Sequence, residues 1–263
     1  SQKREYHYAS EGQWRSILEK DGKKKEATTN IAQGKGFQYA SFNGDAIAYD
    51  ERGNLTAHEK KIFEYDPFNR LTHVKDKATQ HLIATYTYDA LNRRVKKQVF
   101  FEHVRMGPFA SHTTKEVEQA TDTGSTIRAI DYVYDNWNVV EQYENGQLGN
   151  VYIHGKTIDE PVALKRNGKF FYYHRDRLGS ITGLSDEHGR MAQRYAYGEY
   201  GTLTALGPEP EKKGRVAGAK TSELPSIAPI DNPFTYTGQY HDAETGLYYY
   251  KNRYYSAKLG TFL

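Results

Sequence analysis

Two carboxylates ten residues apart mark the part of the sequence with the clearest potential for chemistry. Asp176 and Asp186 lie in the stretch "YYHRDRLGSITGLSDEHGR" (172–190), and Arg175 directly precedes the first. Two carboxyl groups held close together share one proton, so one can activate water while the other polarises a carbonyl group. Arg175 could hold a carboxylate or a substrate backbone by a bidentate contact. The same residues are also typical of β-turns, because aspartate followed by glycine is common turn chemistry.

The elements that carry the two acids decide between these interpretations. We expect a β-hairpin, with Asp176 near one turn and the stretch "SITGL" leading to Asp186 at the next turn. Residues ten apart on successive strands can converge or diverge. The spacing alone therefore leaves a catalytic pair open and favours two structural turns. Glu187 is adjacent to Asp186 and is an alternative second acid.

The sequence around this stretch is repetitive, and each repeat predicts one β-hairpin. Tyr-Asp pairs occur at 49–50, 65–66, 88–89 and 134–135, and a degenerate copy spans residues 6–22. In each Tyr-Asp copy an alternating stretch ends in tyrosine, aspartate begins a turn, and Gly or Asn follows where a positive φ is needed, whereas the degenerate copy keeps the alternation and the Gly but lacks the Asp. Isolated hairpins are marginal in water, so successive hairpins must pair into a continuous antiparallel sheet. The predicted fold class is all-β.

Composition supports this fold class and narrows the function. The chain has 23 Tyr and 23 Gly among 263 residues, which favours strands and turns. Its 36 Lys and Arg against 33 Asp and Glu are too balanced to indicate nucleic acid or an acidic membrane as a partner. No apolar run reaches the ~18–20 residues that span a bilayer. Cysteine is absent and the histidines lack metal-ligand spacing, so we expect no metal and no cofactor.

The repeats resemble the YD repeats of the Rhs family. The second half of the chain resembles the Rhs-repeat-associated core, through "IDEPVAL" (158–164), residues 172–189, "YAYGEYG" (195–201) and residues 234–263. The resemblance implies YD-repeat hairpins over 1–140 and the core domain over 141–263, with an extended loop at about 205–233. It also implies that the strip of hairpins spirals into part of a hollow shell, which a plug-like core closes.

The resemblance further implies a shell that encloses a C-terminal toxic polypeptide and releases it by one cut. The family's cutting site is similar to an aspartic protease, and its residues carry over to Asp176, Asp186 and Arg175. The expected cut follows Leu263 and Phe262 in "KLGTFL", where Thr261 replaces the usual arginine. Because the sequence stops at Leu263, we expect this end to be the product of such a cut.

Several partners follow from the same resemblance. They are the cleaved toxin, held noncovalently, an N-terminal part of the shell or another shell chain, and a delivery protein of a secretion system. We expect a bacterial protein, made in the cytoplasm and exported by a type VI injection or toxin-complex machine. Two alternatives stay open. One is a structural module without cleavage, and the other is a cell-surface carbohydrate-binding module that uses exposed tyrosines.

Overall fold

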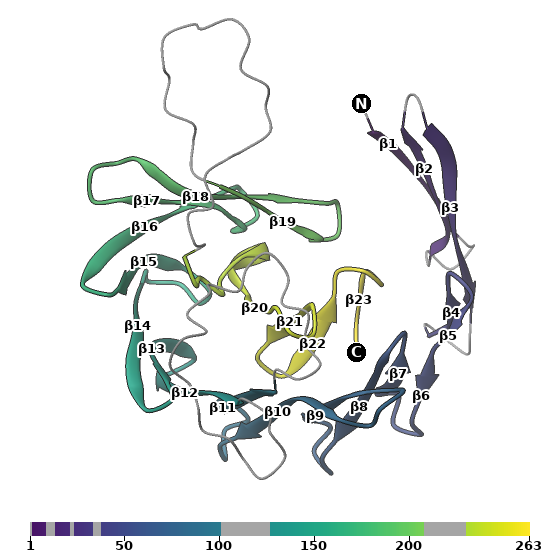
Figure 1. The fold of residues 1–263 in the computed structure, drawn as a ribbon, viewed down its shortest axis with the longest axis horizontal. Coiled ribbons are helices and arrows are strands. Elements are labelled where there is room, and N and C mark those ends of the chain that lie inside the picture. The colour runs from purple at the N-terminus through teal and green to yellow at the C-terminus, as the bar shows by residue number, and fades with distance from the viewer. Residues whose placement is uncertain (1, 9–13, 22–23, 34–37, 101–126, 208–229) are drawn as a thin grey trace, which may run out of the picture. The chain divides into compact units, whose positions relative to one another are not determined.

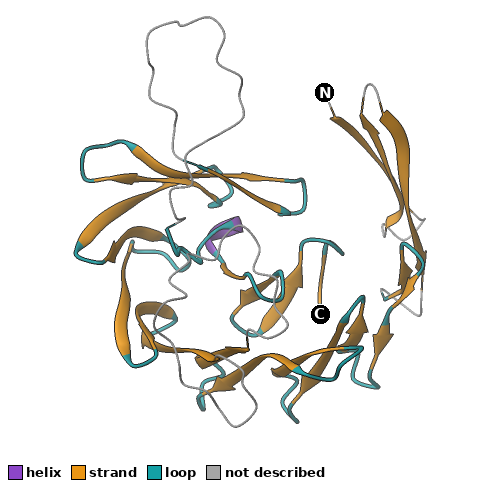
Figure 2. Ribbon diagram, viewed as in Figure 1, coloured by secondary structure: helices purple, strands orange, loops and turns teal. Residues whose placement is uncertain are grey.

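Antiparallel strands make up nearly all of the regular structure. The computed structural model describes residues 2–8, 14–21, 24–33, 38–100, 127–207 and 230–263, in two compact units, Ser1–His81 and Leu82–Leu263 (Figure 1). In the described residues the one helix is the 3-10 turn η2 (Tyr236–Gly238) (Figure 2). The prediction of an all-β fold built from antiparallel hairpins is confirmed. The predicted boundary at 140/141 concerns family domains and stays a prediction.

The first unit consists of two sets of sequentially paired strands. One sheet contains β1 (Gln2–Tyr8), β2 (Trp14–Asp21), β3 (Lys24–Gln33), β4 (Tyr39–Phe42) and β5 (Asp45–Ala46). The second set contains β6 (Ala48–Tyr49), β7 (Leu55–His58), β8 (Lys61–Tyr65) and β9 (Leu71–Asp76). Each strand pairs with the next in sequence, as a series of hairpins requires.

The second unit contains a longer strip in which each strand again pairs with the next one in sequence. Its strands are β10 (Leu82–Tyr88), β11 (Arg94–Phe100), β12 (Ile127–Asp135), β13 (Asn138–Glu144), β14 (Gln147–His154), β15 (Pro161–Arg166), β16 (Lys169–Arg175), β17 (Ile181–Asp186), β18 (Met191–Tyr197) and β19 (Leu203–Leu206). Within this unit the strip curves (Figure 1). Residues 208–229 of the expected loop lie outside the described residues.

A small C-terminal sheet lies inside the curve of this strip (Figure 1). Its strands are β20 (Tyr240–Asp242), β21 (Leu247–Tyr250), β22 (Arg253–Ser256) and β23 (Thr261–Phe262). We call residues 230–263 the C-terminal segment and strands β10 to β19 the wall. Several tyrosines of the segment are buried, including Tyr240, Tyr248 and Tyr254.

An aspartate begins each of the hairpin turns in the first three Tyr-Asp repeats. Oδ1 of Asp66 accepts the backbone N–H groups of Phe68 (2.9 Å) and Arg70 (3.0 Å). Asp50 and Asp89 accept the corresponding N–H groups two and four residues further on. The predicted positive-φ positions are Gly53 (88°), Asn69 (61°) and Asn92 (66°). The turn chemistry expected from the sequence is therefore confirmed in these repeats.

The fourth Tyr-Asp pair makes a different turn. Asp135 pairs with Asn138 across a two-residue connection, and Asn136 takes the positive φ of 51°. The carboxylate of Asp135 accepts a bond from the Asn136 side chain. A shorter loop with asparagine at positive φ is a favoured hairpin connection, which explains the departure from the other repeats.

The tyrosine of the repeat connects one hairpin to a preceding one. The Tyr65 hydroxyl donates to the carbonyl of Leu55 (3.0 Å). Two equivalent bonds run from Tyr134 to Arg94 (2.9 Å) and from Tyr197 to Ile181 (2.5 Å). Each acceptor is the first residue of the strand that follows an Asp-initiated turn. The hydroxyl thus satisfies a backbone carbonyl while the ring packs on the sheet.

Turns alternate between the two edges of the wall, because consecutive strands are antiparallel. The turns after β10, β12, β14, β16 and β18 share one edge, here called the first rim. Contacts between neighbouring turns follow this rim: Arg93 Nη1 donates to the Asn136 carbonyl (2.7 Å), and Arg175 Nη2 donates to Glu160 (2.7 Å). The turns after β13, β15 and β17 share the opposite edge, the second rim.

Removing one of the connecting hydroxyls tests this account. Tyr65→Phe should lower the free energy of unfolding by about 1 kcal/mol, because the buried Leu55 carbonyl loses its partner. Urea unfolding followed by circular dichroism measures the change. Tyr172→Phe is the matched control, because Tyr172 is 44% exposed and its loss should change little. Equal effects of the two substitutions would contradict the connecting role.

Candidate functional site

Both predicted catalytic acids begin turns of the repeat type. Asp176 Oδ1 accepts the N–H groups of Leu178 (2.8 Å) and Ser180 (2.9 Å). Asp186 Oδ1 accepts those of His188 (2.9 Å) and Arg190 (3.0 Å). The geometry matches that of Asp66 and Asp89, so both acids have a structural role that needs no chemistry.

The structure does not bring these two acids together. Asp176 follows β16 at the first rim, whereas Asp186 ends β17 and faces Phe171 at the second rim. The five steps along the strand from Ile181 to Asp186 span roughly 17 Å at the rise of a β-strand. Glu187 lies in the same second-rim turn as Asp186 and is equally remote. A proton shared between Asp176 and either acid is not supported by this arrangement.

Charge at Asp186 is also unfavourable for acid catalysis. The backbone N–H of Arg190 holds the pKa of Asp186 below its ordinary value, and the Arg190 guanidinium adds to this effect. A catalytic pair needs one carboxyl that retains a proton near neutral pH. Asp186 is instead stabilised in its charged form.

Arg175 contacts an acid other than the two predicted ones. Its Nη2 donates to Glu160 Oε1 at 2.7 Å, and both residues lie at the first rim. The Thr157 hydroxyl and then Arg175 lower the pKa of Glu160 to about 2. Arg175 therefore connects two neighbouring turns in the described structure. The expected contact with a catalytic carboxylate or a substrate remains a prediction.

Asp176 differs from the other turn aspartates at its second carboxylate oxygen. Asp66, Asp89 and Asp186 each bind the Nε of an arginine four residues later through Oδ2, and Asp50 binds Asn54. The corresponding residue after Asp176 is Ser180. Among the described residues Asp176 Oδ2 has no hydrogen-bond partner, and the side chain is exposed. Among these turn aspartates, Asp176 is therefore the one whose Oδ2 has no hydrogen-bond partner in the described residues.

Ser180 instead helps to hold the C-terminal segment. Its Oγ accepts the backbone N–H of Thr237 (3.0 Å), and the N–H of Ile181 donates to the Thr235 carbonyl (2.9 Å). These bonds place η2 beside the turn of Asp176. The turn at 176–180 is thereby one of several turns of the wall that contact the segment, as the bonds of Tyr248 to Gly201 and of Lys251 to Asp159 also show.

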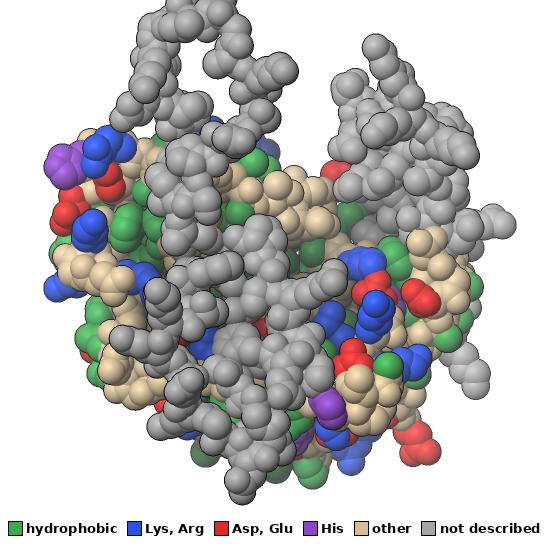
Figure 3. Space-filling view, in the orientation of Figure 1, with side chains coloured by type: hydrophobic (Ala, Val, Ile, Leu, Met, Phe, Trp, Pro, Cys, Tyr) green, Lys and Arg blue, Asp and Glu red, His purple; other side chains and the backbone are tan. Residues whose placement is uncertain are grey.

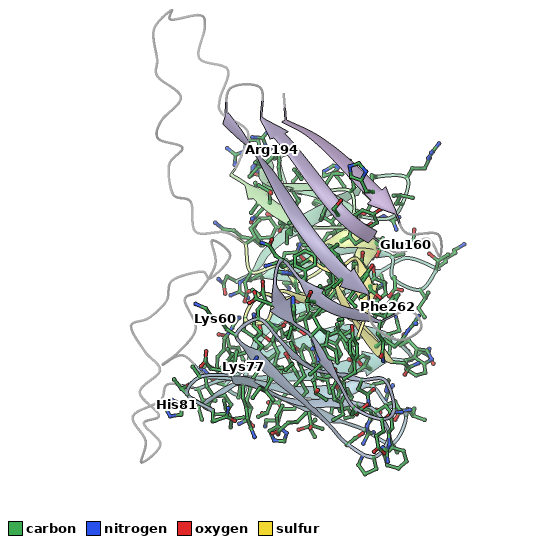
Figure 4. All side chains as sticks on the ribbon, turned by 90° about the vertical axis from the view of Figure 1, so that its right-hand side faces the viewer. Lys60, Lys77, His81, Glu160, Arg194 and Phe262 are labelled. Atoms are coloured by element: carbon green, nitrogen blue, oxygen red, sulfur yellow. The ribbon has the colours of Figure 1, made fainter. Side chains whose placement is uncertain are left out.

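An aromatic cluster extends from η2 to the last residues of the chain. Tyr236 stacks on Tyr255 with ring centroids 6.4 Å apart, and Tyr255 contacts Phe262 at 5.3 Å. Tyr250 packs edge-on against Phe262 (5.2 Å), while the Arg253 guanidinium lies 3.8 Å from the Phe262 ring centroid. Phe262 lies on the same side as the first-rim residue Glu160 (Figure 4).

The backbone at the predicted cleavage site is also held. The N–H of Leu263 donates to the carbonyl of Tyr254 (2.9 Å), and β23 pairs with β22. Phe262 and Leu263 therefore form part of the small sheet. The structure places both predicted cleavage residues but does not test whether a cut occurs.

A buried charge cluster joins the segment to the wall, and we did not predict it. Asp242 Oδ2 accepts from Arg94 Nη1 (2.5 Å), and its Oδ1 accepts from Arg94 Nη2 (3.1 Å) and Lys97 Nζ (2.8 Å). Lys97 also contacts Glu244 (3.1 Å). Asp242 is fully buried. Burial opposes its charge, yet Arg94 and Lys97 hold its pKa below the ordinary value.

Tyrosines surround this cluster. The Arg94 guanidinium lies 4.3 to 5.9 Å from five ring centroids, those of Tyr86, Tyr132, Tyr240, Tyr249 and Tyr254. Three of these rings belong to the segment and two to the wall. Such contacts are attractive when the cation is desolvated. The sequence signal was present but unused, because Asp242 lies within "YHDAETGLYYY", which served only for the resemblance.

Other kinds of site find little support in the described residues. No cluster of His, Asp or Glu there could hold a metal ion. None of the helical segments described is long and apolar enough to cross a membrane. On the visible surface Lys and Arg side chains are interspersed with Asp and Glu (Figure 3), in keeping with the net charge of +3.

The chain is similar in sequence to segments of known toxins. No family model matches it. Its sequence relatives include the tRNA3(Ser)-specific nuclease WapA of Bacillus spizizenii, 27% identical over 98% of this chain. Toxin protein Tse5 of Pseudomonas aeruginosa is 27% identical over 83% of this chain, and double-stranded DNA deaminase toxin A of Burkholderia cenocepacia is 26% identical over 82%. The chain spans 9%, 16% and 14% of the lengths of these three relatives, respectively.

Solved structures share the fold. TcdB2-TccC3 without its hypervariable C-terminal region has a TM-score of 0.66 and 15% identity over 98% of this chain, which covers 12% of that chain. TcdB2-TccC3 itself has a TM-score of 0.61 and 17% identity over 99% of this chain, again with 12% of that chain covered. These structures show that the chain shares their fold, and the sequence relatives support the resemblance to the Rhs-related family.

Truncation of Arg94 should destabilise the second unit. Arg94→Met leaves Asp242 buried with one cation instead of two, and breaking a buried pair in this way costs about 3 kcal/mol. Arg190→Met is the control, because its bond to Asp186 is formed by a side chain that is 75% exposed and such pairs contribute under about 1 kcal/mol. Denaturant unfolding compares the two variants. Similar losses would contradict a special role for the buried cluster.

Acid should weaken the second unit through His241. Burial lowers the pKa of His241 from 6.5 to about 4, against the opposing charge of Asp242. The unfolded chain then binds a proton that the folded chain does not, so stability falls as the pH drops from about 6.5 to 4. The loss is at most about 3 kcal/mol.

The variant His241→Phe keeps a ring beside Tyr248, whose centroid lies 4.9 Å away. It should therefore show a smaller loss of stability over this pH range. Thermal unfolding at several pH values between 7 and 4 measures the difference. Parallel pH profiles for wild type and variant would show that His241 does not carry the effect.

Proposed function

We propose that the chain is a wall-and-plug portion of a toxin shell, which encloses a C-terminal toxic polypeptide and releases it by one cut. The observation that carries this proposal is the docking of the C-terminal segment inside the curve of the wall. Buried ions and tyrosine hydroxyls from both parts make this contact. A segment held so firmly is suited to close one end of a container.

The remainder of such a container would come from outside this chain. The chain spans 16% or less of the curated toxin relatives described above. Further hairpins, from an N-terminal part of the same protein or from another shell chain, would complete the wall. The cleaved toxin would remain bound noncovalently, and a delivery protein of an injection or toxin-complex system would export the assembly.

The proposed cut follows Leu263, with Asp176 as the acid best placed to assist. Its free Oδ2 and its position at the first rim support this choice over Asp186. As a general base it would take a proton from water that attacks the Leu263 carbonyl; the C–N bond to the next residue then breaks, and the leaving amine takes up a proton. The scissile bond is tethered to the wall, so a weak catalyst suffices for one turnover. The second acid of an aspartic mechanism would come from the rest of the longer protein.

Cleavage is tested with a longer chain. We expect a protein that continues past Leu263, as encoded in its gene, to appear as two bands on a denaturing gel. Asp176→Asn should slow the cut by a factor of about 10² to 10⁴, as loss of a general base does. Asp186→Asn is the matched control, because it changes a turn of the same type at the other rim. It should leave the cut unchanged.

The outcomes separate the alternatives. An uncut wild-type chain favours a purely structural module. Equal slowing by both substitutions indicates damage to turns rather than loss of a base. If Asp176→Asn cuts normally while Asp186→Asn does not, the choice between the two acids is wrong.

A further inference from the structure

Two inward positions recur in the strand that follows the turns of Asp50, Asp66, Asp89 and Asp176, whereas the equivalent residues after Asp186, Met191 and Arg194, are half-buried. The two positions are the fifth and eighth residues after the aspartate. In three hairpins these positions hold Leu55 and His58, Leu71 and Val74, and Ile181 and Leu184. All six side chains are buried, with exposures between 0% and 8%. The positions are therefore core positions of the repeat, and five of the six are apolar.

The hairpin of Asp89 departs from this rule at both positions. Arg94 and Lys97 occupy them and are equally buried, with exposures of 1% and 4%. The backbone there is unchanged, since the Arg94 carbonyl accepts the Tyr134 hydroxyl as the Leu55 carbonyl accepts that of Tyr65. Two cations thus replace core side chains without altering the hairpin.

The C-terminal segment carries the matching anions. Asp242 is 0% exposed and uses both carboxylate oxygens on Arg94 and Lys97. Glu244 reaches Lys97 and accepts from the Tyr86 hydroxyl (3.4 Å). On the other sides of the cluster, Tyr254 and Tyr249 accept from Arg94 Nη1 (3.2 Å) and Arg94 N (2.9 Å). The charges therefore match across the contact between wall and segment.

We propose that Arg94 and Lys97 are specificity residues that fix where along the wall the C-terminal segment docks. Within the wall, the hairpin after Asp176 has the buried apolar residues Ile181 and Leu184 at the equivalent positions. A segment docked against those residues instead would leave Asp242 buried among apolar side chains, which is strongly unfavourable. Among the described hairpins that follow an Asp-initiated turn, the one after Asp89 is the one with buried cations at both positions, and these cations remove this cost.

The same argument distinguishes specificity from stability. Replacing a buried ion cluster by apolar residues of similar size is often neutral or stabilising, while a buried polar group can select one register. The buried ion cluster should therefore be dispensable for folding, but it should be needed to restrict the C-terminal segment to a single docking position. This inference concerns a contact within the present chain, so it is tested independently of toxin release.

The experiment measures how uniquely the segment is placed. The chain has no cysteine, so spin labels attach only where cysteine is introduced. Glu187→Cys on the wall and Asn252→Cys on the segment are exposed turn positions. Double electron–electron resonance spectroscopy then gives the distribution of distances between the two spin labels. We expect one narrow distribution for the otherwise unchanged chain.

The test variant gives the Asp89 hairpin the apolar residues of its neighbour. It combines Arg94→Leu and Lys97→Val with Asp242→Leu and Glu244→Gln. We expect a melting temperature equal to or above that of the unchanged chain, and a distance distribution that is broader or has several maxima. A single narrow distribution in this folded variant would overturn the proposal.

Two further variants complete the test. Lys96→Gln with Asp131→Asn removes an exposed ion pair between β11, the strand of Lys97, and β12, and it should leave the distribution narrow. If the apolar variant does not fold, Arg94→Gln with Asp242→Asn removes the central charges while keeping polar side chains. Broadening is expected there too, and a narrow distribution would likewise overturn the proposal.

Discussion

The carboxylate that accepts two backbone N–H groups at the start of a hairpin turn sets the geometry on which the rest depends. In the turns of Asp66 and Asp89 it binds the N–H groups two and four residues later. This places the next strand at a constant distance along the sequence. The fifth residue then offers its carbonyl to a tyrosine of a following hairpin, and the fifth and eighth side chains turn inward. Local turn chemistry thereby determines which residues can meet the C-terminal segment.

The same constraint separates the two acids that the sequence placed ten residues apart. Successive turns of an antiparallel sheet must lie at opposite edges. Asp176 and Asp186 begin successive turns, so they cannot form a close pair while β17 stays extended. A pair of catalytic groups on such a wall needs turns separated by an even number of strands, or a partner from a segment that crosses the wall.

More of the fold than of the candidate site could be predicted from the sequence. Tyr-Asp spacing, alternation and Gly or Asn after the turn are local signals, and they indicated hairpins at Asp50, Asp66 and Asp89 correctly. Pairing between Arg94 and Asp242 spans 148 residues and leaves no local pattern. A signal was nevertheless present: both inward positions of one repeat are cationic. Comparing equivalent positions between repeats, rather than searching for catalytic spacings, would have found it.

The core of the second unit explains why such a cluster is tolerated. Its buried side chains include many tyrosines, whose hydroxyls bond one another or backbone carbonyls, as Tyr132 does with Tyr240. A core of this kind already contains satisfied polar groups, and in the ion cluster of the described structure Arg94 Nε is the one buried Arg94 side-chain atom without a hydrogen-bond partner, so the cluster adds little unsatisfied polarity. Leucine at positions 94 and 97 would also suit an apolar core, but it would not disfavour a C-terminal segment docked at another position. In the proposed shell, a contact that disfavours wrong docking positions would be more useful than a stronger contact that tolerates them.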